Sequence, residues 1–301
     1  MRLGTTTTLF LNNPSGRDIS TIECIKRCSA AGFSVLDMNF FPMLSGRTEF
    51  VKDNWKEEAY KIRESADEAG MVFSQSHLPY HPNYMKLNPP GDSTFNERFD
   101  EYMKRSVEIS GILGVKWAVC HPYACTDADS YDNDADIAIT HRFYDPILEA
   151  LKKARVGLAI ENIVGMQPPI RRRFTAIADE LCELIDSFKD ESVGACWDFG
   201  HGNQIYKDQK RAIRKVGSRL RATHLNDNRG RTDAHTLPFV SGTTDWEECL
   251  PVLSEIDYDG DLVYEVKCGV NLPNQLKDDF ATLAVEIGKH CLSLAQKGER
   301  A

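Results

Sequence analysis

The 301-residue chain lacks the features that define several large classes of protein. No apolar stretch approaches the roughly 18 residues needed to span a bilayer. The N-terminus, MRLGTTTTLF, has one arginine but no sustained apolar run, so a signal peptide is not expected. The glycine-rich phosphate loops GxGxxG and GxxxxGK[ST] are both absent, so no nucleotide cofactor is expected. A formal net charge of −9 argues against general nucleic-acid binding, which needs a basic surface.

Cysteine is present, but without the spacing of a disulfide framework or a zinc motif. The nine cysteines are scattered and none form a CxxC pair, while Cys24 and Cys28 have the spacing of one helical turn. An odd, scattered set in a chain of this size predicts reduced, mostly buried thiols in a cytoplasmic protein.

The hydrophobic pattern predicts alternating strands and helices. Short β-branched or aromatic runs recur, each followed by a segment with helical spacing. The expected strands are Leu3–Phe10, Phe33–Met38, Met71–Ser76, Val115–Cys120, Val156–Ile160, Val193–Trp197, Arg221–Leu225 and Leu262–Tyr264. Eight such units without a break in composition predict a single-domain α/β protein, a (β/α)8 TIM barrel over residues 1–301, rather than an open sheet. The first strand is unusually polar for a barrel, because it contains Thr5–Thr8.

Residues with metal-binding side chains stand at the ends of most of these strands. They are Asp37, His77, His121, Glu161, Asp198, His224 and Glu265, with His201 one helical turn after Asp198. Five of the eight histidines fall at strand ends or in the loop after the seventh strand. In a β/α barrel these positions converge on the C-terminal rim, where such enzymes place their catalytic groups.

A subset of these residues predicts a metal site. Carboxylates and imidazoles that converge from different strands repel one another or stay unsatisfied unless a cation lies between them. The predicted ligands are Glu161, Asp198, His224 and Glu265. Three oxygens and one nitrogen suit one divalent ion, Mn²⁺, Co²⁺ or Mg²⁺, and tolerate Zn²⁺. For any one of them alone a structural hydrogen-bonding role is favoured, but four on consecutive strands favour a metal.

Four segments resemble the metal-binding strand ends of the xylose isomerase-like barrel superfamily. They are AIEN (159–162), WDFGHGN (197–203), THLND (223–227) and LVYEV (262–266). That superfamily includes sugar and sugar-phosphate isomerases and epimerases, inosose dehydratases and zinc-dependent apurinic-site endonucleases. The resemblance, which runs from about His77 to Glu265, implies the same four metal ligands and a substrate contact for His201.

The loop after the seventh strand adds a second possible set of ligands. Asp233-x-His235 resembles a DxH pair that the endonuclease branch uses for additional zinc ions, and His77 and His121 match its other histidine ligands. All nine ligand positions of the endonuclease branch therefore have a suitable residue here: His77, His121, Glu161, Asp198, His201, His224, Asp233, His235 and Glu265. In both branches a G-x-G stretch normally follows DxH, but LPFVSGTTDW here retains only Gly242. Asp233 and His235 have the alternative of a loop-stabilising pair, and for His77 and His121 we favour substrate contact over a second metal.

Several other residues are candidates for substrate binding. Arg229 and Arg231, beside the ligand loop, are the better candidates for holding a phosphate, and Arg171–Arg173 after the fifth strand are weaker ones. Tyr80 and Tyr84 have the character of residues that stack on a sugar face.

The leading hypothesis is a metal-dependent sugar or sugar-phosphate isomerase or epimerase. Glu161 and Glu265 would move a proton through an enediolate, and His201 would stabilise its oxygen. The alternatives are an apurinic-site phosphodiesterase, an inosose-type dehydratase, and a barrel that only binds a sugar. The expected partner is a small sugar or polyol, with neither nucleic acid nor membrane, and a homo-oligomer is left open.

Overall fold

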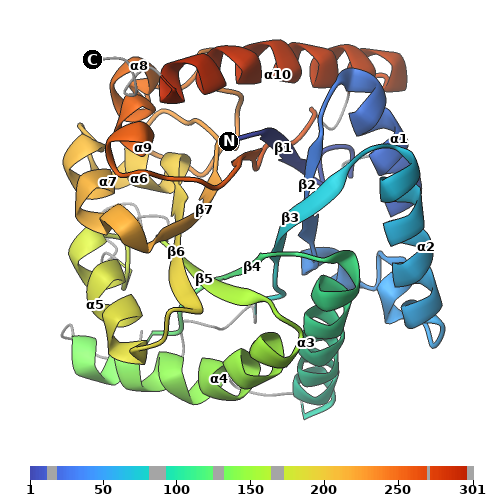
Figure 1. The fold of residues 1–301 in the computed structure, drawn as a ribbon, viewed down its shortest axis with the longest axis horizontal. Helices are drawn as coiled ribbons and strands as arrows, with labels where there is room; N and C mark the ends of the chain where they lie inside the picture. The colour runs from blue at the N-terminus through green and yellow to red at the C-terminus, as the bar shows by residue number, and fades with distance from the viewer. Residues whose placement is uncertain (12–18, 81–92, 125–131, 164–172, 270–271, 297–301) are drawn as a thin grey trace.

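Eight parallel strands form a nearly closed barrel that is surrounded by helices (Figure 1). The computed structural model describes residues 1–11, 19–80, 93–124, 132–163, 173–269 and 272–296. The strands are β1 (Leu3–Thr6), β2 (Val35–Asn39), β3 (Val72–His77), β4 (Trp117–Cys120), β5 (Gly157–Glu161), β6 (Val193–Asp198), β7 (Leu220–His224) and β8 (Leu262–Tyr264). The predicted fold class, a (β/α)8 TIM barrel, is confirmed.

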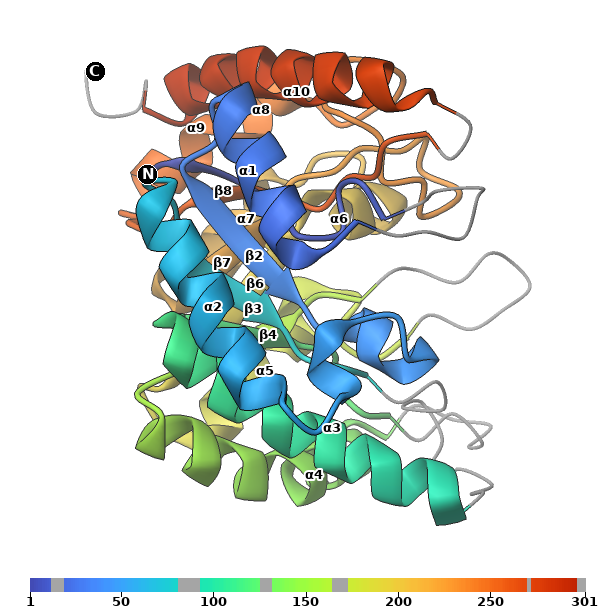
Figure 2. The same ribbon diagram turned by 90° about the vertical axis from the view of Figure 1, so that its right-hand side faces the viewer.

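The helices lie between consecutive strands on the outside of the barrel, and Figure 2 shows α1 and α2 over β2. The α-helices are α1 (Thr21–Ala31), α2 (Trp55–Glu68), α3 (Ser93–Leu113), α4 (Asn133–Lys153), α5 (Ala178–Phe188), α6 (Phe199–Ile205), α7 (Lys210–Val216), α8 (Trp246–Cys249), α9 (Pro251–Glu255) and α10 (Asn274–Ala295). Short 3-10 helices are η1 (Phe41–Ser45), η2 (Glu49–Val51) and η3 (Gly217–Arg219). None of the helices in the described part of the chain combines the length and apolar character that crossing a membrane requires.

Strand pairing follows the order of the chain and then closes on itself. Each strand pairs in parallel with the next from β1 to β7, and β1 also pairs with β8. Between β7 and β8 the closure is a single parallel bridge, Leu225 to Tyr264, with the Leu225 N–H donating to the Val263 carbonyl at 2.7 Å. Because all strands run in one direction, their C-terminal ends meet at one end of the barrel.

Small side chains fill the barrel directly below that end. The interior layer consists of Val119, Ala159, Cys196 and Ala222, all buried. Two residues further along each strand stand His121, Glu161, Asp198 and His224. Since side chains alternate between the two faces of a strand, these residues face inward above the small layer. These small residues form a packed apolar layer beneath a ring of imidazoles and carboxylates.

The helix ends show the local signals that place each strand. Gly32, Gly70 and Gly114, which precede β2, β3 and β4, have φ values of 107°, 67° and 75°. Glycine takes this left-handed conformation without a Cβ penalty, which explains the AAGF, EAGM and ILGV turns. At the other end of a helix, Ser20 caps α1 by accepting from the Glu23 N–H at 3.2 Å.

The first predicted strand is wrong in its length. The expected strand Leu3–Phe10 ends at Thr6, and Thr7–Phe10 form turns. The Leu9 N–H donates to the Thr6 carbonyl at 3.1 Å, and the hydroxyls of Thr6 and Thr8 are 3.0 Å apart. These local hydrogen bonds compete with the strand ladder, as short hydroxyl side chains often do.

The predicted burial of the cysteines is confirmed for the described residues. Eight of the nine cysteines are described, and each of these is buried and free of a disulfide bond. Cys24 and Cys28 lie one turn apart on α1 with their sulfur atoms 3.8 Å from each other. The ninth, Cys125, lies outside the described residues.

Candidate metal centre

The four predicted metal ligands come together at the C-terminal end of the barrel. Glu161, Asp198 and His224 are the last residues of β5, β6 and β7, and Glu265 directly follows β8. One donor atom from each of the four lies within 4.8 Å of the donor atoms of the other three. The first three residues are fully buried, while the Glu265 side chain is 14% exposed. Four strands therefore supply one compact set of three carboxylates and an imidazole.

His224 is oriented by a carboxylate on the opposite side of its ring. Its Nδ1 lies 2.9 Å from Glu161 Oε1 and 3.5 Å from Glu265 Oε2. Its Nε2 lies 3.1 Å from Asp37 Oδ2, which also accepts from Gln75 Nε2 at 3.0 Å. A proton on Nε2 that is donated to Asp37 leaves the Nδ1 lone pair facing the other donors. Histidine ligands are commonly held in this way by a carboxylate.

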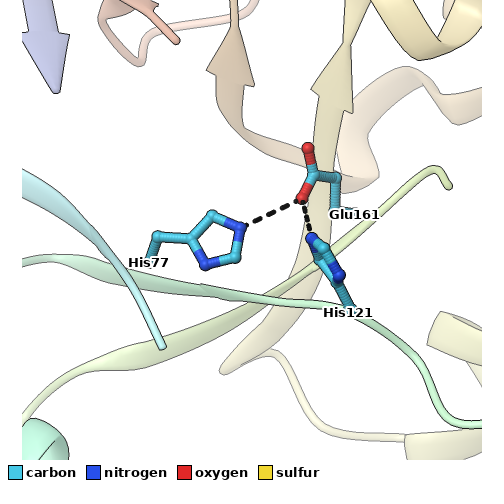
Figure 3. Close-up of side chains that lie close together, drawn as sticks. All are labelled: His77, His121 and Glu161. Carbon is cyan, nitrogen blue, oxygen red and sulfur yellow. Dashed lines mark ion pairs between the residues drawn. The ribbon is translucent and has the colours of Figure 1, made fainter. Parts of the chain in front are cut away.

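Glu161 is shared between two groups of side chains. Figure 3 shows His77 and His121 pointing at the Glu161 carboxylate. Their Nε2 atoms lie 3.4 and 3.1 Å from Glu161 Oε2, whereas Oε1 faces His224. Burial opposes ionisation of Glu161, but His224, His121 and His77 together hold its pKa well below the ordinary value. This carboxylate is therefore an anion that bridges two neighbouring sets of imidazoles.

Asp198 has two structural partners besides its place among the donors. Its Oδ1 accepts from the His201 backbone N–H at 2.7 Å and so caps α6, and its Oδ2 accepts from Asn226 Nδ2 at 2.6 Å. Asn162 binds the Asp198 backbone on both sides, accepting from its N–H at 2.6 Å. Burial raises the pKa of Asp198 to about 6, although His201 opposes the shift.

The Asp233-x-His235 pair lies beside the four donors. His235 Nε2 is 2.9 Å from Asp233 Oδ2, and His235 Nδ1 is 2.6 Å from the Glu265 backbone carbonyl. His201 Nε2 is 3.6 Å from Asp233 Oδ1, and His201 Nδ1 is 2.8 Å from the Asn162 carbonyl. Burial alone would lower the pKa of His235, but Glu265 and Asp233 raise it to about 9. The pair links the loop after β7 to the end of β8.

These residues fit a divalent cation. Glu161 Oε2 is buried and accepts no well-directed hydrogen bond from the described residues, although the Nε2 atoms of His77 and His121 lie 3.4 and 3.1 Å from it. Three carboxylates within 4.8 Å of one another repel unless positive charge lies among them. A second group, His77, His121 and Glu161, also has its donor atoms within 4.8 Å of one another and shares Glu161 with the first. Oxygen and imidazole donors of this kind suit first-row divalent metals.

A cavity of about 330 Å³ opens above the donors. It is lined by Thr8, Leu11, Asn39, Phe41, Pro42, Ser45, Arg47, His77, Tyr80, His121, His201, Asp233, His235, Glu265 and Lys267. Tyr80 stacks between His121 and Phe41, with ring centroids 4.3 and 4.8 Å away. The predicted residues His77, His121, His201, Asp233 and His235 thus share one cavity with the proposed metal ligand Glu265.

The two arginines predicted to hold a phosphate are not among the described residues that line this cavity. Arg229 is exposed and its Nε donates to the Ser241 carbonyl at 3.0 Å, and Arg231 is also exposed. Two cations that the sequence did not single out, Arg47 and Lys267, line the cavity instead. Tyr84, Arg171 and Arg172 lie outside the described residues.

Buried polar contacts fix the loop that carries Asp233 and His235. The Asp227 carboxylate accepts from Trp246 Nε1 at 2.8 Å and from the backbone N–H groups of Asn228, Thr243 and Thr244. A Cβ on Gly242 would lie 1.9 Å from Asp227 Cγ. The one glycine retained after DxH is therefore the residue that lets the loop close onto Asp227.

Sequence reasoning missed the residues that support the donors. The sequence pattern predicts Asp37 only as a polar strand end, and it predicts no role for Gln75, Asn162 or Asn226. Their signal in the sequence is a polar residue inside an otherwise apolar strand, or next to a ligand in the segments AIEN and THLND. Such a signal is weak, because the partner of each residue lies on a different strand.

Comparison with known proteins places the chain in a family. The sequence model of the xylose isomerase-like TIM barrel matches residues 25–284. The chain belongs to this family. A curated relative, the uncharacterized protein y4fM of Sinorhizobium fredii (strain NBRC 101917 / NGR234), is 25% identical over 167 residues, which are 55% of this chain and 51% of that protein. The matched part thus spans about half the length of that relative.

Solved structures of similar fold cover almost the whole chain. D-psicose 3-epimerase from Clostridium cellulolyticum H10, with D-tagatose, has a TM-score of 0.73 at 16% identity over 97% of this chain and 99% of that one. A D-tagatose 3-epimerase-like protein gives 0.73 at 19%, with 99% of both chains covered. The 3-keto-D-glucoside 4-epimerase from E. coli gives 0.70 at 14%, over 95% and 99%. At these identities the likeness shows a common fold.

Proposed function

We propose that this protein is a divalent-metal-dependent isomerase or epimerase of a sugar or sugar phosphate. The observation that carries the proposal is the set of four donors within 4.8 Å of one another, beside a cavity large enough for a small sugar. The family match and the sugar epimerases of similar fold support this reaction class.

Glu161, Asp198, His224 and Glu265 would hold the metal. When bound there, a divalent cation supplies Lewis-acid polarisation of a sugar carbonyl and its neighbouring hydroxyl. Asp37 and Gln75 keep the His224 ring in place from behind. Asn226 does the same for Asp198.

Glu161 and Glu265 would remove and return the proton next to the carbonyl, although the two side chains differ in their access to the cavity. Glu265 lines the cavity and reaches it directly. Glu161 is fully buried, and its Oε2 contacts the two imidazoles of His77 and His121, which themselves line the cavity. To reach a substrate carbon, the Glu161 carboxylate must move away from His77 and His121. His201, also in the cavity lining, would stabilise the sugar oxygen that gains negative charge.

The test is turnover and proton exchange by the metal-loaded protein. Ketoses and their phosphates are incubated in D2O, and deuterium incorporation next to the carbonyl is measured for wild type, Glu161→Gln and Glu265→Gln. Each variant is expected to lose at least about 10²-fold in exchange, because each removes one proton carrier. Glu247→Gln, at an exposed position on α8, is the matched control. Full exchange in both catalytic variants would refute the assignment.

A second candidate function is hydrolysis of a phosphodiester at abasic DNA sites. The observation that favours it is the second donor group, His77, His121 and Glu161, because paired metals that share a carboxylate are typical of phosphoester hydrolysis. Metal content separates the two functions: one ion per chain supports the isomerase, and two or three zinc ions favour the phosphodiesterase. Incision of an abasic duplex at stoichiometric protein would decide for the latter.

A further inference from the structure

We propose that the substrate carries an anionic group, a phosphate or a carboxylate, at the end remote from the metal-binding residues, and that Lys267 and Arg47 bind it. The inference takes from the proposed function only that a sugar-like molecule occupies this cavity.

Lys267 lies on the same side of the segment after β8 as the proposed ligand Glu265. Both line the cavity. Val266 and Cys268 alternate with them and are buried, and the Cys268 thiol is 4.0 Å from the Lys277 carbonyl of α10. In extended backbone successive side chains point to opposite faces. Glu265 and Lys267 therefore both face the cavity, with the lysine one step further from the barrel.

Arg47 lines the same cavity but comes from a distant part of the chain, the segment after η1. Gly46, with a φ of 68°, turns the backbone so that the Arg47 N–H donates to the Pro42 carbonyl at 3.1 Å. One guanidinium nitrogen is 3.5 Å from the Leu11 carbonyl. Leu11 and Pro42 also line the cavity, so this contact holds the arginine along the cavity wall.

The charges around the cavity favour an anion at these two residues. Both acidic side chains in the lining are already engaged: Asp233 faces His201 and His235, and Glu265 belongs to the metal donors. Lys267 forms no ion pair with any carboxylate in the described part of the chain. Hydroxyl groups of a neutral sugar accept hydrogen bonds from lysine and arginine, but a phosphate or carboxylate accepts stronger, charge-assisted hydrogen bonds from both.

The test measures binding without turnover, using calorimetry on the Mn²⁺-loaded protein. The probes are D-glucitol, D-glucitol 6-phosphate and D-gluconate, which have no carbonyl to react. We expect at least one anionic probe to bind about tenfold more tightly than D-glucitol. Lys267→Met and Arg47→Met should each remove most of that preference, measured against D-glucitol binding to the same variant. Arg229→Met is the matched control, because its guanidinium is held by Ser241 outside the lining.

Each outcome decides the proposal. Equal affinity for all three probes overturns it, and so does a preference for anions that neither variant reduces, because the anion would then bind the metal itself. The probe whose affinity Lys267→Met lowers identifies the phosphate or the carboxylate. The proposed function fails separately, if no sugar exchanges deuterium with D2O, and a Lys267-dependent anion site would survive that failure.

Discussion

Replacing Asp37 should weaken metal binding although the residue is not itself a ligand. Asp37 is 1% exposed, and its Oδ2 lies 3.1 Å from His224 Nε2. Removing this acceptor leaves the ring free to rotate and makes its Nδ1 a weaker donor. Asp37→Asn loses the charge but can keep one oxygen that accepts from both His224 Nε2 and Gln75 Nε2. Asp37→Leu removes the acceptor altogether.

The magnitude follows from the kind of contact. Loss of a carboxylate behind a histidine ligand typically costs about 10- to 100-fold in metal affinity, or about 1.4 to 2.7 kcal/mol. We expect Asp37→Asn near the lower end and Asp37→Leu near the upper end, because only the second leaves the buried Nε2–H without an acceptor.

The assay is competition for Mn²⁺ or Zn²⁺ with a chromophoric chelator at fixed pH. Asp259→Asn, at an exposed position, controls for the general loss of negative charge. Circular dichroism establishes that each variant is folded. If both Asp37 variants are folded and bind metal as tightly as wild type, His224 is not held by Asp37 in the metal-bound state, and the reasoning is refuted.

Three further predictions follow from contacts at and below the site. Metal affinity should fall as the pH is lowered from 7 to 5, on the order of tenfold per pH unit for each proton that the metal must displace, because the pKa of Asp198 is raised to about 6 and its protonated form cannot bind. Gly242→Ala should reduce the free energy of unfolding in urea by about 1–3 kcal/mol, since its Cβ would lie 1.9 Å from Asp227 Cγ. Gly157→Ala should cost a similar amount, because its Cβ would lie 2.2 Å from Trp117 Cζ3, and Trp117→Leu should recover part of this loss.

Each of these has a clear contrary result. A metal affinity that is constant between pH 5 and pH 7 would mean that Asp198 is not a ligand or is not protonated in this range. A Gly242→Ala variant with wild-type stability would mean that the loop closes without contact to Asp227. Strictly additive losses for Gly157→Ala and Trp117→Leu would show that the indole does not occupy the space above Gly157.

The sequence by itself was enough to predict the barrel and the convergence of its polar strand ends. Parallel strands in a closed barrel bring all their C-terminal ends to one rim, so a Glu, Asp or His at the end of a strand is placed by the fold without knowledge of contacts. For this reason Glu161, Asp198, His224 and Glu265 could be predicted as one group, and the structure brings them within 4.8 Å of one another. Whether they hold a metal stays a prediction.

Only the tertiary structure decided which residues stand behind and around that group. Asp37 meets His224 from across the barrel, and the pairing of β2 with β3 shifts register between Leu36 and Asp37, which no local pattern reveals. Arg229 is adjacent to the ligand loop in sequence, yet it is held outside the cavity, whereas Arg47 and Lys267 line it. Loop side chains are placed by contacts between distant segments, and the sequence contains no periodicity that encodes such contacts.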